Sequence, residues 1–247
     1  MARRGWVSPA ATLKGRLVKD MLRFGLAATA AMFCTFSGAM SSIDTTPSWN
    51  GTNSASYFGE PDSATYGQTI STDAIGGVLT SFTFYLSPLN LDFKAFVYQW
   101  DGAKAVGPAL YSSAVTNIGD GFTGFRATSF NTGGVSLAAN TAYVLFFSTS
   151  GVQAQRFNTN TWGALSTDAY SGGEFVFHNS SNDPSSLLAA AGWDCPSGCD
   201  YLGRGADLAF KASIAPAPVA VPEPSALVLA VVGLGLVGAA VRRRTKG

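Results

Sequence analysis

The feature of this sequence that most limits its fold is an alternation of apolar and polar residues with a period of two. Such alternation places one set of side chains on each face of a strand and is typical of antiparallel sheets with one buried face. The pattern is clearest in five stretches: 78–86, 91–100, 122–130, 174–178 and 207–214. The stretch 143–147 is continuously apolar instead, which predicts a short strand buried on both faces.

Turn signals separate these stretches, and four of them stand out: Asp101-Gly102, 117–121, 131–134 and Gly172-Gly173. No convincing amphipathic helix interrupts the pattern, and 185–191 would form one short helical turn at most. Many short strands joined by glycine-rich turns predict an all-β fold. We expect two antiparallel sheets packed as a jelly-roll-like sandwich.

The N-terminus has the pattern of an export signal. Six basic residues precede an apolar run at 24–38, and Ser37-Gly38-Ala39 supplies the small side chains that a signal peptidase reads. We predict a signal peptide at 1–39 with a helical apolar segment, cleaved after Ala39. A start at Met21 would give a signal of more usual length than a start at Met1, and the sequence leaves both open.

The C-terminus carries a second apolar segment. Residues 225–241 contain no charge, and these 17 residues would rise about 25 Å as a helix, near the short limit for crossing a hydrocarbon core of about 30 Å. Three arginines follow, and they would snorkel to the interface and hold that end in the cytoplasm. We therefore predict a transmembrane helix and a precursor anchored in the inner membrane, with its body facing outward.

The order of elements at this end resembles the PEP-CTERM sorting tag of Gram-negative bacteria. The resemblance rests on residues on both sides of the apolar run: Val221, Pro222, Glu223, Pro224, Arg242, Arg243 and Arg244. It implies recognition by an exosortase, a membrane transpeptidase that cuts near the motif and moves the body to the cell surface or its exopolysaccharide. An ordinary C-terminal anchor is the alternative.

The body also resembles the domain of many PEP-CTERM proteins, at 66–69, 79–82, 98–102, 107–111 and 207–210. This resemblance implies a secreted β-sandwich and brings no ligand with it. The predicted organisation is a signal peptide at 1–39, a β-sandwich domain at 40–214, a stiff Ala/Pro linker at 215–220 and the sorting tag at 221–247.

Processing changes the charge of the protein. Residues 40–220 contain six basic and thirteen acidic side chains, so the body has a formal charge of 6 − 13 = −7. An acidic exported body has no electrostatic footprint for nucleic acid, and we exclude nucleic acid as a partner. Its length of about 180 residues suits one domain with a proper core.

Two cysteines remain after the signal peptide, in the sequence Cys195-Pro-Ser-Gly-Cys199. In an oxidising compartment the simplest prediction is a local disulfide. The alternative is a redox or zinc site. Zinc takes about four ligands, however, and His178 is the one histidine of the chain.

Catalytic patterns are scarce. The sequence has no G-x-S-x-G elbow, and one histidine leaves a single candidate base for a Ser-His-Asp scheme. We predict a protein that is not an enzyme and has no cofactor. A secreted hydrolase that acts on matrix polysaccharide with a pair of carboxylates is the alternative.

Two sets of residues suggest binding. Trp162 and Trp193 lie in polar, glycine- or serine-containing stretches, where we expect exposed indoles that stack on sugars; the alternative is that they close the core. The second set consists of acidic residues at turns and strand ends, which we expect to be solvated. The alternative is that some of them bind a structural Ca²⁺: Glu60, Asp62, Asp101, Asp120, Asp183 and Asp207.

These patterns together predict an exported protein of the cell surface or exopolysaccharide matrix, with a structural or glycan-binding role. The expected partners are signal peptidase, an exosortase, extracellular polysaccharide and, before processing, the membrane.

Overall fold

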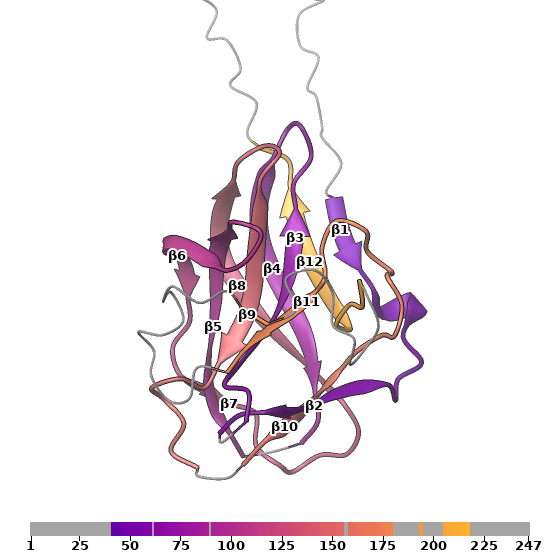
Figure 1. Cartoon of the computed structure of the whole chain (residues 1–247), viewed down its shortest axis with the longest axis vertical. Coiled ribbons are helices and arrows are strands. Elements are labelled where there is room, and N and C mark those ends of the chain that lie inside the picture. Colours follow the sequence, from indigo (N-terminus) through magenta and orange to yellow (C-terminus); the bar gives the residue numbers. More distant parts are fainter. Residues whose placement is uncertain are drawn as a thin grey trace, which may run out of the picture. The chain divides into compact units, whose positions relative to one another are not determined.

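The computed structural model describes residues 41–60, 62–88, 90–155, 158–179, 193–194 and 205–217. The described chain forms two antiparallel sheets that pack face to face (Figure 1). The prediction of an all-β, two-sheet sandwich is confirmed, and the one helix among the described residues is the 3-10 turn η1, Thr46–Ser48. The predicted signal helix and membrane helix lie outside the described residues.

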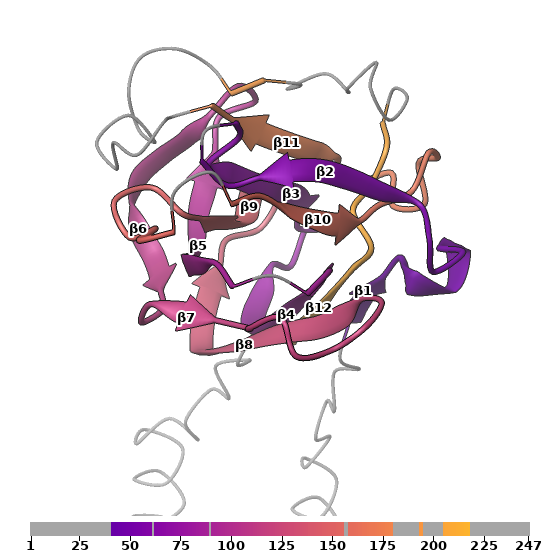
Figure 2. The same cartoon turned by 90° about the horizontal axis from the view of Figure 1, so that it is seen from below.

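The first sheet, called sheet A here, has the strand order β1-β12-β4-β10-β2, and β8 pairs with the other edge of β4. Its strands are β1 (Ser41–Asp44), β2 (Ser54–Phe58), β4 (Gly77–Leu86), β8 (Arg126–Leu137), β10 (Asn160–Gly163) and β12 (Phe210–Ala215). Figure 2 shows β8, β4, β12 and β1 side by side along one side of the sandwich.

The second sheet, sheet B, has the order β11-β3-β9-β5-β6, and β7 pairs with the beginning of β5. Its strands are β3 (Thr65–Ser71), β5 (Asp92–Trp100), β6 (Ala105–Ser112), β7 (Thr116–Asn117), β9 (Ala142–Ser148) and β11 (Phe175–His178). The apolar patterns in the sequence predicted β4, β5, β9 and β11 to within two residues of their ends, and they predicted β8 and β12 with shifted ends. They did not predict β1, β2, β3, β6, β7 or β10.

The core between the sheets is largely aromatic. Phe82, Phe84 and Leu86 point inward from β4, while Thr83 and Tyr85 point outward, as the alternation predicts. Phe147 of β9 lies at the centre, with its ring centroid 4.9 Å from that of Phe93 and 5.1 Å from that of Phe84. Each such ring contributes about 1.5–3 kcal/mol by leaving water.

Strand β9 is buried on both faces because a second cluster covers the outside of sheet B. Val144 and Phe146 face this cluster, which also contains Trp100, Val176 and Trp193. The continuous apolar run at 143–147 therefore has the structural cause that the sequence predicts: neither face of the strand meets water.

The first described strand begins, and the last described strand ends, at the same end of the sandwich. Ser41 at the start of β1 pairs with Ile214 near the end of β12, and Ala215 pairs with Val78 of β4. We call this the β1–β12 end (upper end in Figure 1).

Candidate functional site

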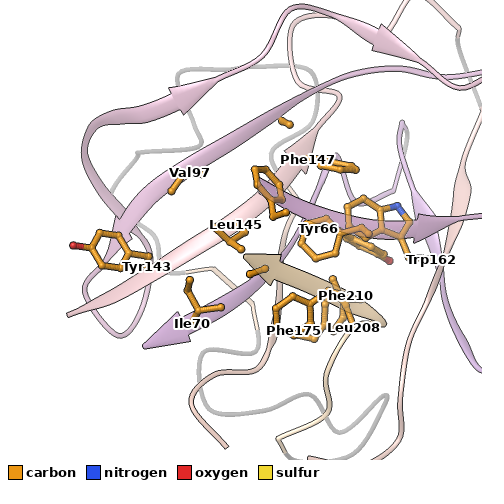
Figure 3. Packing of buried hydrophobic residues seen from close by; sticks show 14 of the residues in the cluster. Tyr66, Ile70, Val97, Tyr143, Leu145, Phe147, Trp162, Phe175, Leu208 and Phe210 are labelled. Carbon is orange, nitrogen blue, oxygen red and sulfur yellow. The ribbon is translucent and has the colours of Figure 1, made fainter. Parts of the chain in front are cut away.

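The prediction that Trp162 is exposed is wrong. Its side chain is fully buried and lies beside Phe147 in the core (Figure 3). The ring centroids of Phe58, Phe84 and Phe147 are 4.9–5.0 Å from that of Trp162. The polar run around Trp162 is a short strand, β10, that pairs with β2 and β4, so the side chains within it alternate like those of any other strand. The indole points into the core and cannot stack on a sugar.

The prediction for Trp193 is also wrong. Its side chain is 2 % exposed and packs edge-on against Trp100 and Phe146, with centroid distances of 5.5 and 5.1 Å, and it also stacks on His178. The Trp193 amide donates a hydrogen bond to the carbonyl of Ala103. Trp193 therefore holds its segment against the outside of sheet B.

Among the tryptophans that the structure describes, Trp49 is the one whose side chain is partly exposed. Its indole lies outside sheet A, with ring centroids 5.4 Å from Tyr85 and 5.1 Å from Phe125, both of which are also partly exposed. Its Nε1 donates a hydrogen bond of 2.8 Å to the carbonyl of Asn53, which fixes the ring. We call Trp49, Tyr85 and Phe125 the outer aromatic patch.

The place of Trp49 depends on Gly163 of β10. A Cβ at that position would lie 2.6 Å from Cζ2 of Trp49, closer than real carbon contacts allow. Glycine thus lets the indole approach the backbone of sheet A. The sequence shows one sign of this patch: Tyr85 is an aromatic residue at an outward position of the β4 alternation.

Polar side chains continue the outer face of sheet A beside the patch. The strand register places four of them in one row across the sheet, Asp44, Lys211, Thr83 and Ser129. Lys211 donates a hydrogen bond of 2.9 Å to Asp44, and the hydroxyls of Thr83 and Ser129 are 2.8 Å apart. Aromatic rings next to hydroxyl, ammonium and carboxylate groups can bind a sugar by its apolar face and its hydroxyls.

Among the described carboxyl groups, that of Asp207 has the most strongly shifted pKa, and its side chain is fully buried. Burial raises its pKa from the usual value to about 6, although three hydrogen bonds favour the ionised form. Gln68 Nε2 donates to Oδ1 at 2.7 Å, and the amides of Ala169 and Tyr170 donate to Oδ2 at 2.8 Å each. Asp207 therefore joins β3 and the 169–170 loop to the segment that leads into β12.

The acids considered for Ca²⁺ do not gather into a site where the structure describes them. The side chain of Asp207 is fully buried. The carboxylate of Asp101 accepts hydrogen bonds from the amides of Ala103 and Lys104 in its own turn. Among the described residues, no three His, Cys, Asp or Glu side chains are grouped so that they could hold a metal ion. Asp183 lies outside the described residues, as do Cys195 and Cys199.

The predicted membrane segments also lie outside the described residues. No helix in the described ranges is long and apolar enough to span a bilayer. The predicted helix at 225–241, the motif residues Val221 to Pro224 and the arginines Arg242 to Arg244 lie beyond the last described residue, Ala217.

Comparison with protein families decides what the C-terminus is. A family model described as the PEP-CTERM protein-sorting motif matches residues 220–244. This chain carries a PEP-CTERM sorting signal. The resemblance noted at 221–224 and 242–244 is thus confirmed. The PEP-CTERM signal is the C-terminal exosortase-recognition signal, so the protein is an exported, surface-directed substrate of an exosortase.

The body of this PEP-CTERM protein was also compared with curated proteins and with solved structures. No curated protein matches the chain. A solved structure that resembles it contains the cysteine protease and lectin-like domains of Cwp84, a surface layer associated protein of Clostridium difficile. The two share 12% sequence identity with a TM-score of 0.40, over 67% of this chain and 37% of the other.

Proposed function

We propose that the body of this protein binds extracellular polysaccharide through the outer aromatic patch, and that its role at the cell surface is not enzymatic. The observation that carries the proposal is the position of Trp49. It is the partly exposed tryptophan among those described, and it lies beside Tyr85 and Phe125 on the outer face of sheet A.

Sugars suit this surface chemically. The C–H faces of a sugar ring pack on flat aromatic side chains, while its hydroxyls exchange hydrogen bonds with neighbouring polar groups. The row that includes Lys211, Thr83 and Ser129 supplies such groups. An open face binds one chain segment weakly, but many copies of the protein on one polymer gain avidity.

The surroundings of Asp207 favour binding over catalysis. A pKa of about 6 would suit a general acid, but this side chain is fully buried and each of its oxygens accepts a hydrogen bond from the protein. A substrate could reach it only after the 169–170 loop had opened. We therefore assign Asp207 to folding stability rather than to polysaccharide hydrolysis.

The proposal includes the path to the surface. The precursor is held in the inner membrane by the span at 225–241 after signal peptidase has acted at Ala39, and an exosortase then cuts near Pro222-Glu223-Pro224. The sorting signal at 220–244 supports the second step. The released body, whose residues 40–220 have a formal charge of −7, joins the exopolysaccharide.

The test is retention on exopolysaccharide of the native host. Tyr85→Ser removes the ring that packs beside Trp49 in the patch and should reduce retention several-fold. The melting temperature should change by only a few degrees, because Tyr85 points away from the core. The matched control is Tyr57→Ser, since Tyr57 is another outward tyrosine of sheet A, 58 % exposed and outside the patch. Equal retention of the two variants and the unmodified protein would refute the proposal.

A further inference from the structure

The chain enters and leaves the sandwich at the same end. Ser41 opposes Ile214 in the β1–β12 pair, and β12 ends at Ala215, five residues before the sorting signal begins at 220. The predicted membrane segment at 225–241, which lies within this signal, is therefore tethered to the β1–β12 end and not to the opposite end. The geometry thus limits which surface of the body can meet the bilayer.

Among the described residues of the β1–β12 end, the most exposed large apolar side chain is that of Ile75. It is 75 % exposed and lies at the tip of the turn 72–76 between β3 and β4, with Ala74 beside it. Because β4 begins at Gly77 and its next residue, Val78, pairs with Ala215, this tip lies close to the point where the chain leaves the body.

The turn presents Ile75 on a braced support. Asp73 Oδ1 accepts hydrogen bonds from the amides of Ile75 and Gly76, at 2.8 and 3.1 Å. Thr72 Oγ1 donates to the carbonyl of Ala138 at 2.6 Å, which ties the turn to the neighbouring 138–141 loop. Ile75 therefore stays exposed even though the turn that carries it is well ordered by hydrogen bonds.

The connecting chain is short enough to bring this tip to the membrane. From Ala215 to Ser225, where the uncharged run begins, are ten residues (225 − 215). An Ala/Pro-rich segment of that length extends at about 3.1 Å per residue, so the body stays within about 30 Å of the hydrocarbon core. The headgroup layer that separates the body from the hydrocarbon core is roughly 6 Å thick. The connecting chain is therefore long enough for the tip of the turn 72–76 to reach the lipid interface.

We propose that, in the membrane-anchored precursor, the β1–β12 end faces the bilayer and Ile75 inserts into the lipid interface. This inference rests on the anchored precursor of the proposed function. The turn 72–76 and the loop 138–141 contain one charged residue, Asp73, and no lysine or arginine. The contact is therefore apolar and should not depend on anionic lipid or on salt. Cleavage by the exosortase then frees Ile75 from the membrane.

The experiment uses the precursor without its predicted signal peptide, residues 40–247, in vesicles of neutral phosphatidylcholine. In a background with its two native cysteines, Cys195 and Cys199, replaced by serine, an NBD fluorophore is attached to Ile75→Cys or to the matched control Val115→Cys. Val115 is also an exposed apolar residue, at 54 %, but it precedes β7 at the opposite end of the sandwich.

We expect a blue shift of NBD emission and quenching by spin-labelled lipid at position 75, unchanged in high salt, and neither effect at position 115. Equal signals at both positions would overturn the proposed orientation. A blue shift without quenching by lipid would also overturn it, because the contact would then be with protein. If the protein fails to float with the vesicles, the anchor itself is wrong, which is a separate result from a floating protein without lipid contact at Ile75.

Discussion

At the scale of single residues, Trp162 shows how packing overrides a polar neighbourhood. Trp162→Ala should lower the free energy of unfolding by about 3–5 kcal/mol, because it empties the space between Phe58, Phe84 and Phe147. Trp162→Phe should cost less than about 2 kcal/mol, since it keeps a ring and removes Nε1, which has no hydrogen-bond partner among the described residues. Urea denaturation measures both. A change within about 0.5 kcal/mol for the alanine variant would mean an exposed indole.

Asp207 makes stability depend on pH in an unusual direction for a carboxyl group. Because burial raises the pKa of Asp207 to about 6, the folded protein holds this proton more tightly than the unfolded chain, whose value is near 3.8. Its contribution to stability is complete below about pH 4 and is lost as the pH rises to about 6, by roughly 1–3 kcal/mol. The carboxyl ¹³C shift of Asp207 should titrate with a midpoint near 6.

The matched variant for this prediction is Asp207→Asn. The amide places an N–H₂ group where the carboxylate accepts from Gln68 or from the amides of Ala169 and Tyr170, so donors would face donors. We expect a loss of about 2–4 kcal/mol at pH 7 and a pH profile without the slope between 4 and 6. An unchanged slope would assign the titration to another group.

At the scale of elements, the attachment of β1 to β12 depends on a buried threonine rather than on the surface ion pair. Thr45 Oγ1 donates to the carbonyl of Leu208 at 2.8 Å and accepts from the amide of Phe210 at 2.9 Å. Thr45→Val keeps the shape but leaves both backbone groups unpaired, and should cost about 2–3 kcal/mol in urea denaturation.

Lys211→Met is the comparison for that variant. It breaks the ion pair with Asp44, in which the Lys211 side chain is 45 % exposed and the Asp44 side chain 34 %. Because the pair is exposed to solvent, the free energy of unfolding should fall by less than about 1 kcal/mol. The opposite ranking of the two variants would mean that charge, and not the Thr45 hydrogen bonds, holds the first strand in place.

At the scale of the whole molecule, both processing steps fall outside the folded strands. The predicted signal-peptidase cut after Ala39 precedes β1, and the sorting signal at 220–244 follows β12. Replacing Pro222-Glu223-Pro224 by three alanines should therefore leave the body folded but block release, so that residues 40–247 stay in the membrane fraction. Intact-mass analysis of the unmodified protein should show a C-terminus near Pro224. Surface-exposed protein that retains residues 225–247 would contradict this.

The sequence by itself determined those features that depend on near neighbours. The alternation of Phe82, Phe84 and Leu86 with Thr83 and Tyr85 predicted the faces of β4, because side chains of a strand point to opposite sides whatever lies beyond them. The apolar run of β9 predicted burial on both faces for the same reason. The sorting signal was readable because its parts are contiguous in the chain.

Only the tertiary structure decided which of the described tryptophans are buried and where the first and last described strands meet. Trp162 and Trp49 both lie in polar stretches, yet pairing of β10 with β2 and β4 buries the first, and Gly163 lets the second rest on the outer face. The pairing of Ser41 with Ile214 joins residues 173 positions apart (214 − 41). Such contacts depend on strand order and register across the whole chain, and local periodicity carries no information about either.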